Sequence, residues 1–144
     1  AISFNQEVPF NTSRVKMFDS VFKSATRFNQ PVNWDLSSAL SLNRMFKWAK
    51  SFNHPIVSRS PNLNQMDEMF SGAESFNSPV ELDTSNVSMM REVFKDAKVF
   101  NQSLDTWRFD KAFVMTDMFL EAVDFSYRLP FDHTRVKYPC ALFN

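Results

Sequence analysis

The residue types that most often carry out chemistry in proteins are sparse in this sequence. The two histidines, His54 and His133, lie far apart, and Cys140 is the single cysteine. A disulfide within the chain and a thiolate zinc cluster are therefore excluded. The sparse set also offers no spacing for a catalytic triad. The one glycine, Gly72, excludes a glycine-rich phosphate loop. We therefore expect no enzyme, no metal and no cofactor.

The balance of charge argues against two classes of partner. Sixteen Lys and Arg residues and sixteen Asp and Glu residues give a net charge of zero, which favours neither nucleic acid nor an anionic membrane surface. No apolar run reaches the roughly 18 residues of a membrane-spanning helix. We expect no transmembrane segment, and membrane association only through partners or a missing anchor. The absence of an initiator Met and of a signal-like segment suggests removed targeting regions or part of a longer protein or assembly.

An internal repeat organises the whole chain of 144 residues. The dipeptide Phe-Asn recurs every 24 residues, and a sixth copy begins one residue late because the fifth carries an extra residue. We number positions within each copy from this Phe as position 0. The pairs are Phe4-Asn5, Phe28-Asn29, Phe52-Asn53, Phe76-Asn77 and Phe100-Asn101. The copies form a single array of residues 4–27, 28–51, 52–75, 76–99, 100–124 and, in part, 125–144.

Two kinds of spacing within each copy predict its local structure. Positions 4 and 6 are apolar and alternate with their neighbours, which is typical of a very short strand. Positions 11, 14, 17, 18 and 21 are apolar with spacings of three and four, which is typical of a helix face of about three turns. Phe recurs at position 18 and Ala at position 21. We therefore expect a core column of Phe closed by Ala.

A strand and a helix every 24 residues fall within the range of leucine-rich repeats. Stacked strands advance by about 4.8 Å per copy, whereas packed helices need about 8–10 Å. This mismatch should curve the stack, with the strands on its concave side. The predicted fold class is an α/β repeat solenoid. It is a leucine-rich-repeat-like, right-handed arc with a short parallel strand and a helix in each repeat.

The segments 45–53 (MFKWAKSFN) and 69–77 (MFSGAESFN) resemble the repeats of the bacterial surface-protein family called BspA-like. Such repeats are typical of mycoplasma and listerial surface lipoproteins and also occur in eukaryotic microalgae and other protists. The resemblance implies a leucine-rich-repeat-like fold at a cell surface or outside the cell, with adhesion or interaction roles and no catalysis. An organellar or membrane complex of a microalga or protist is the alternative location. The Trp-Asp pair of the family is clear only at Trp34-Asp35.

The repeated Asn at position 1 admits two interpretations. It is either a ligand-binding ladder or a structural ladder. We favour the structural ladder, because a buried Asn in every copy bonds the backbone groups that each turn leaves unpaired. The residues of these structural ladders include Phe28, Asn29, Phe52, Asn53, Phe76, Asn77, Phe100 and Asn101.

Position 7 carries charges whose sign alternates from the second copy onward. These residues are Asp35, Arg59, Asp83, Arg108 and Asp132. Stacking should place them side by side on the concave edge, where opposite charges attract. They form either a charged binding strip or pairs that fix the register of the stack. We favour register-fixing pairs, each worth about 0.2–1 kcal/mol.

Apolar residues at positions where other copies are polar mark a candidate partner surface. These residues are Leu40, Trp48, Phe113, Val114 and Leu120. Trp48 replaces Ser, Gly, Asp or Glu at position 20. We expect these side chains to face outward on the convex side, where an aromatic cluster would anchor a protein partner.

These features predict a non-catalytic repeat scaffold for protein–protein interaction or surface adhesion. The alternative, from a different class, is a structural peripheral subunit of a larger complex, membrane-bound or organellar. In both cases the expected partner is another protein.

Overall fold

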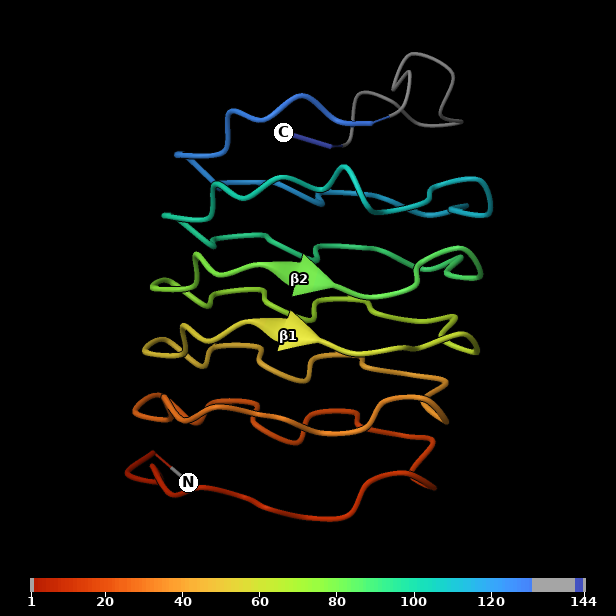
Figure 1. Cartoon of the computed structure of the whole chain (residues 1–144). Helices are drawn as coiled ribbons and strands as arrows, with labels where there is room; N and C mark the ends of the chain where they lie inside the picture. The colour runs from red at the N-terminus through yellow and green to blue at the C-terminus, as the bar shows by residue number, and fades with distance from the viewer. Residues whose placement is uncertain (1, 131–141, 144) are drawn as a thin grey trace.

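The computed structural model describes residues 2–130 and 142–143 of the chain. Successive copies of the repeat stack as layers of one column, with chain order running from bottom to top (Figure 1). We number the layers in chain order, so that layer 1 is residues 4–27 and layer 3 is residues 52–75. The two strands, β1 (Ile56–Val57) and β2 (Val80–Glu81), lie in adjacent layers and pair in parallel, with Ile56 opposite Val80.

One side of the column has the side-chain alternation of a parallel sheet. From position 3 to position 8 of the central layers, side chains alternate between the surface and the core, as strand geometry requires. In layer 3, Pro55, Val57 and Arg59 are exposed, whereas Ile56 and Ser60 are buried. We call the exposed positions 3, 5 and 7 of all layers the strand face.

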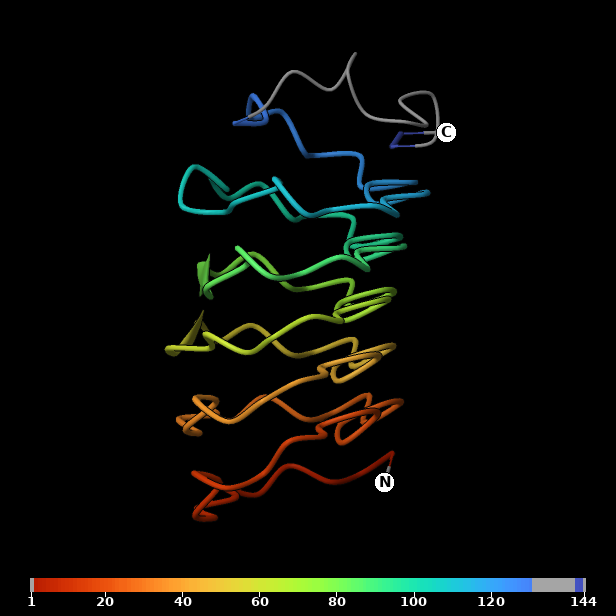
Figure 2. The ribbon, with the colours of Figure 1, turned by 90° about the vertical axis from the view of Figure 1, so that its right-hand side faces the viewer.

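The opposite side of the column is built from the turn segment, positions 13–20 of each layer (Figure 2). Backbone N–H groups at positions 14, 16, 18 and 20 donate to carbonyl oxygens of the next layer. The bonds from Phe22 to Met45 and from Phe46 to Met69 are both 2.8 Å long. Isolated parallel bridges join Met17 to Ser41, Ser41 to Gln65, Gln65 to Met89 and Met89 to Val114. Alternate N–H groups of this segment therefore bond between layers.

The predicted α/β solenoid with a helix in each repeat is wrong, because the described residues contain two short strands and no helix. Positions 16 and 20 have φ between 53° and 72° in five layers. These residues are Ser20, Ser24, Arg44, Trp48, Glu68, Gly72, Glu92, Asp96, Asp117 and Glu121. A residue in the left-handed region interrupts a right-handed helix. The apolar spacing of three and four thus comes from two successive tight turns in each layer.

The spacing of the layers explains why helices are absent. Phe rings at position 18 of consecutive layers have centroids 5.3–5.7 Å apart. Helices packed side by side need about 8–10 Å, so one helix per layer does not fit. Extended and turn backbone does fit, because its spacing is close to that of paired strands. The mismatch between strand and helix spacing, from which a curved arc was predicted, is therefore absent from the described residues.

The identity of the left-handed residues is also unexpected. The scarcity of glycine predicts that Asn or Asp supplies positive φ, because these residues tolerate it best. Of the nine such non-glycine residues described, only Asp96 and Asp117 fit, and none is Asn. The bonds between layers hold Ser, Glu, Arg and Trp in the same conformation instead.

Two stacked columns of Phe form the core. In five layers, the ring at position 18 lies 3.9–4.2 Å from the ring at position 0 that begins the next layer. Along the column of position 0, consecutive rings are 5.7–5.9 Å apart. The Ala at position 21 is buried in every layer where it occurs. A small residue there lets the chain close the last turn against these rings.

Exchanging residues of the turn segment for glycine tests this description. Asp117 has a φ of 54°, whereas the neighbouring Thr116 does not have positive φ. Asp117→Gly should raise the free energy of unfolding by about 0.5–1 kcal/mol, because glycine adopts the left-handed region without strain. Thr116→Gly should lower it by about 0.5–1 kcal/mol. Chemical denaturation measures both changes. A loss of stability in both variants is the result that a helix would give.

Candidate functional site

Position 20 forms a column along the edge of the turn segment. Its residues are Ser24, Trp48, Gly72, Asp96 and Glu121, all with positive φ. Each of the four N–H groups from Ser24 to Asp96 donates to a carbonyl of the next layer at 2.7–2.8 Å. The backbone thus holds this position rigidly, and only its side chain varies. Trp48 is the one aromatic residue in the column, and 47% of its surface is exposed.

Trp48 leans over the single glycine of the chain. A Cβ atom placed on Gly72 would lie 2.2 Å from Cδ1 of the indole and 3.0 Å from Nε1. No side chain larger than hydrogen fits beneath the ring unless the ring moves. Gly72 is therefore required by its neighbour one layer away, and glycine also adopts the φ of 72° without strain. The contact fixes one edge of the indole and leaves part of the ring in solvent.

Two lysines lie over the exposed part of the indole. The Nζ atoms of Lys47 and Lys23 are 4.7 Å and 5.7 Å from the ring centroid. Both distances permit a cation–π attraction, which is worth about 0.5–1 kcal/mol at exposed sites. Burial lowers the pKa of Lys47, as do the neighbouring cations, while Glu92 opposes the shift. Glu68 forms an ion pair with Lys47 and holds its stem beside the ring.

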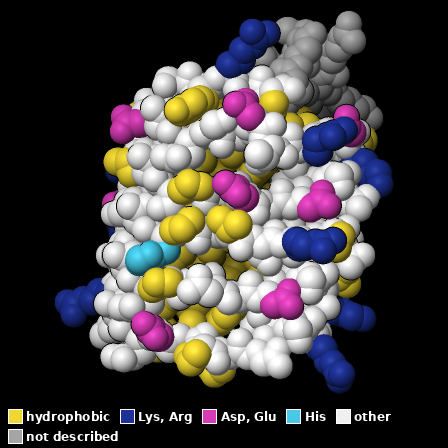
Figure 3. All heavy atoms as spheres, in the orientation of Figure 1, with side chains coloured by type: hydrophobic (Ala, Val, Ile, Leu, Met, Phe, Trp, Pro, Cys, Tyr) yellow, Lys and Arg dark blue, Asp and Glu magenta, His cyan; other side chains and the backbone are white. Residues whose placement is uncertain are grey.

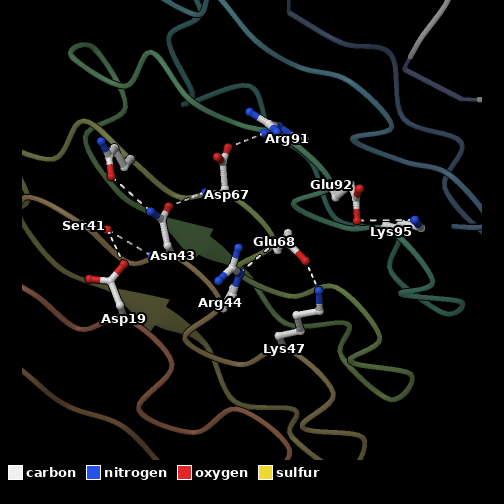
Figure 4. A network of polar contacts seen from close by, with 11 residues as sticks. Asp19, Ser41, Asn43, Arg44, Lys47, Asp67, Glu68, Arg91, Glu92 and Lys95 are labelled. Carbon is white, nitrogen blue, oxygen red and sulfur yellow. Dashed lines mark hydrogen bonds and ion pairs between the residues drawn. The ribbon is translucent and has the colours of Figure 1, made fainter.

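A polar network anchors the turn segment behind these lysines (Figure 4). Oδ1 of Asn43 accepts from the backbone N–H of Asp67 at 2.8 Å, and Oδ1 of Asp67 accepts from that of Arg91 at 2.7 Å. Arg44 pairs with Glu68 at 3.0 Å. Position 15 thus ties layer 2 to layer 3 and layer 3 to layer 4 through a side chain, and the network limits movement of the segment that carries Trp48.

A shallow groove runs beside Trp48 across four layers. Its volume is about 500 Å³, and it is lined by Ser24, Thr26, Trp48, Lys50, Gly72, Glu74, Asp96 and Lys98. These are positions 20 and 22 of layers 1 to 4. Lys50 and Glu74 form an exposed ion pair of 3.1 Å. We call this set the Trp48 groove. It offers one apolar anchor between charged and hydroxyl side chains, and its length follows the stack.

The five apolar residues predicted to mark a partner surface do not form one cluster. Leu40 and Trp48 belong to layer 2, whereas Phe113, Val114 and Leu120 belong to layer 5. Phe113 is exposed over 57% of its surface, and the other members apart from Trp48 are half-buried. Trp48 is the one member that lines the groove. Lys23, Lys47 and Gly72 were not predicted, although the lone Gly one repeat after Trp48 was a visible signal.

The Asn residues at position 1 join the layers through their side chains. Oδ1 of Asn29 accepts from the backbone N–H of Asn53 at 3.0 Å, and Oδ1 of Asn53 accepts from that of Asn77 at 2.9 Å. The same bond links Asn5 to Asn29 and Asn77 to Asn101. These residues are mostly exposed, so the expectation that the ladder is buried is wrong. The amide oxygens of Asn5, Asn29, Asn53 and Asn77 already accept hydrogen bonds from the backbone of the next layer.

Of the charges at position 7, Asp35, Arg59, Asp83 and Arg108 lie exposed on the strand face. Within the described residues, no ion pair joins Asp35 to Arg59, Arg59 to Asp83, or Asp83 to Arg108. Arg108 instead pairs with Asp110 at 3.2 Å. The predicted register-fixing pairs are therefore not formed as direct contacts. The fifth residue of the set, Asp132, lies outside the described residues.

Two of these carboxylates cap their own turns. The hydroxyl and the backbone N–H of Ser37 bond Asp35 and lower the pKa of its carboxyl below the ordinary value. Ser85 lowers the pKa of Asp83 in the same way, with a smaller contribution from Arg108. A carboxyl whose pKa is lower in the folded than in the unfolded protein stabilises the fold above the unfolded pKa. This stabilisation is lost as the pH falls through the folded pKa.

Replacing both caps, Asp35→Asn with Asp83→Asn, should therefore change how stability depends on pH. The free energy of unfolding of the double variant should fall less steeply than that of wild type as the pH decreases below about 5. Denaturation at several pH values measures this slope, and an unchanged slope would contradict it.

The described residues contain no metal-binding group of three or more His, Cys, Asp and Glu residues. His54 lies 3.2 Å from the carbonyl oxygen of Asn29 through Nε2, which is a contact between layers. His133 and Cys140 lie outside the described residues. In the same part of the chain, no helix is long and apolar enough to cross a membrane.

One protein family matches this sequence over residues 1–61 and again over residues 57–138. The chain belongs to the family described as "Mycoplasma protein of unknown function, DUF285". No curated protein and no solved structure matches the sequence. The two matches together span all five complete layers. The repeat, and not one segment of it, therefore carries the family pattern.

Proposed function

We propose that this member of the DUF285 family is a non-catalytic repeat scaffold that binds a protein partner along the Trp48 groove. Exposure of Trp48 is the observation that carries the proposal. Position 20 holds a small or acidic residue in layers 1, 3, 4 and 5, so stacking of the layers does not require an aromatic residue there. Tryptophan is among the residues most enriched at the energetic centres of protein interfaces.

The surroundings of Trp48 suggest the kind of segment that binds. Lys23 and Lys47 lie over the indole, and Lys50 and Lys98 line the groove, against three carboxylates, those of Glu68, Glu74 and Asp96. This local excess of positive charge favours a segment with acidic residues beside an aliphatic or aromatic one. A groove that crosses four layers suits an extended chain better than a compact ligand. The similarity to BspA-like repeats supports display at a cell surface, with adhesion as the role.

Selection from a library of random linear peptides tests the proposal. We expect the wild-type chain to enrich peptides that combine an apolar residue with Asp or Glu. Trp48→Ala should weaken their binding by at least tenfold, or about 1.4 kcal/mol. Val57→Ala is the matched control, because Val57 is an exposed apolar residue on the strand face, and it should leave binding unchanged. The proposal fails if no peptide is enriched, or if the enriched peptides bind Trp48→Ala as well as wild type.

A further inference from the structure

The alternating charges of the strand face are available to a partner. Arg59 is exposed and takes part in no ion pair within the described residues. The ion pair between Arg108 and Asp110 leaves about 70% of both side chains in solvent. Such a pair exchanges partners at little cost. In Figure 3, acidic and basic side chains alternate along the right-hand side of this face.

The order of these charges is self-complementary. Read along the column, Asp35, Arg59, Asp83 and Arg108 run negative, positive, negative, positive. A copy that faces this column and runs in the opposite direction presents the reverse order. Each charge then meets its opposite, with Asp35 against Arg108 and Arg59 against Asp83, each pairing occurring twice. A two-fold axis in the plane of the face, between β1 and β2, produces this arrangement.

The other columns of the face obey the same symmetry. At position 3, Glu7 of layer 1 meets Arg128 of layer 6, and both are exposed. Between them at this position lie three exposed prolines and a serine, which are Pro31, Pro55, Pro79 and Ser103. At position 5, Val57 meets Glu81, and Asn33 of layer 2 meets Asp105 of layer 5. No like charges meet among these described residues, and the central contact at position 3, between Pro55 and Pro79, is apolar.

We infer that the strand face binds a second copy of this chain, with the two columns antiparallel about an axis between β1 and β2. The prolines of position 3 supply the apolar contact, and Val57, which is 61% exposed, packs against the aliphatic stem of Glu81 in the other copy. Four ion pairs between the copies, formed by Asp35, Arg59, Asp83 and Arg108, fix the direction. The interface lies on the side of the column opposite the turn segment. It is independent of the proposed function and leaves the Trp48 groove of each copy open.

Sedimentation equilibrium of the whole chain tests this inference. We expect a concentration-dependent dimer that weakens as ionic strength rises, because exposed charges are screened by salt. Arg59→Asp places two acidic side chains opposite each other at two places and should weaken dimerisation by at least about tenfold. Arg108→Asp should have the same effect, because it places a second carboxylate opposite Asp35 of the other copy. Lys98→Asp, a charge reversal in the Trp48 groove, is the matched control and should leave the dimer unchanged.

A double exchange separates pairing between copies from pairing within the chain. Arg59→Asp with Asp83→Arg gives the order negative, negative, positive, positive, which is still self-complementary when reversed. The dimer should return to within about threefold of wild type. If the charges paired between adjacent layers of one chain instead, the double exchange would not restore the wild-type behaviour. It would then place two negative charges in layers 2 and 3 and two positive charges in layers 4 and 5.

Every outcome of these measurements decides the inference. A wild-type chain that stays monomeric at all concentrations overturns it, and so does a dimer that Arg59→Asp leaves intact. Failure of the double exchange to restore the dimer overturns it as well, provided that circular dichroism shows the variant to be folded at the temperature of the measurement. Should Arg59→Asp fail to fold, Arg108→Asp with Asp35→Arg supplies the same comparison.

Discussion

Replacing Phe70 with alanine should lower the free energy of unfolding by about 3–5 kcal/mol, the largest loss that we expect from one substitution. Phe70 is fully buried. Its ring lies 4.1 Å from that of Phe76, and 5.5 Å and 5.6 Å from those of Phe46 and Phe94. Truncation leaves a cavity in the middle of both ring columns, and the interlayer bonds prevent the layers from collapsing into it. Denaturation in urea measures the loss.

Position in the stack provides the control for this experiment. Phe4 lies at position 0 of layer 1 and is only half-buried, with one layer neighbour at 5.7 Å. Phe4→Ala should therefore cost much less than Phe70→Ala. Equal losses at the two sites would show that the Phe columns do not act as one stacked core.

Gly72→Ala should lower the free energy of unfolding by about 2–5 kcal/mol, even though it adds a single methyl group. Two effects combine. Alanine in the left-handed region costs about 1–2 kcal/mol, and forcing the indole of Trp48 aside costs about 1–3 kcal/mol. The environment of Trp48 should change as well, so its fluorescence spectrum should shift.

A double-mutant cycle separates these two effects. In the Trp48→Ala background, the added methyl group meets no ring, and only the backbone cost of about 1–2 kcal/mol should remain. An equal cost of Gly72→Ala in both backgrounds would contradict the contact between Gly72 and the indole.

The stacking of the copies could be predicted from the sequence, but the conformation inside each copy could not. Phe-Asn every 24 residues identified the repeat and the residues at equivalent positions in successive layers. The spacing of three and four at positions 11–21 fits a helix, but two tight turns place side chains on the same side as well. The decisive residues, such as Arg44 and Glu68, have positive φ and are good helix formers. Their conformation is set by bonds between layers, which no local pattern reveals.

The same limit applies to the candidate site. The departure of Trp48 from the repeat was visible in the sequence and identified the residue that lines the groove. Phe113, Val114 and Leu120 lie three layers away from it, and their role as a partner surface stays a prediction. The role of Gly72 depends on a contact across layers, which becomes apparent only once position 20 of one copy is known to lie beside position 20 of the next.

The turn segment is not helical, and its conformation holds Trp48 over Gly72. Solution NMR of the backbone and of the Trp48 indole tests it most directly. We predict that the φ-sensitive couplings of Glu68, Glu92 and Trp48 report positive φ, and that a nuclear Overhauser effect joins the indole Hδ1 of Trp48 to Hα of Gly72. Chemical shifts of continuous helix over residues 38–49, without that Overhauser effect, would contradict the account.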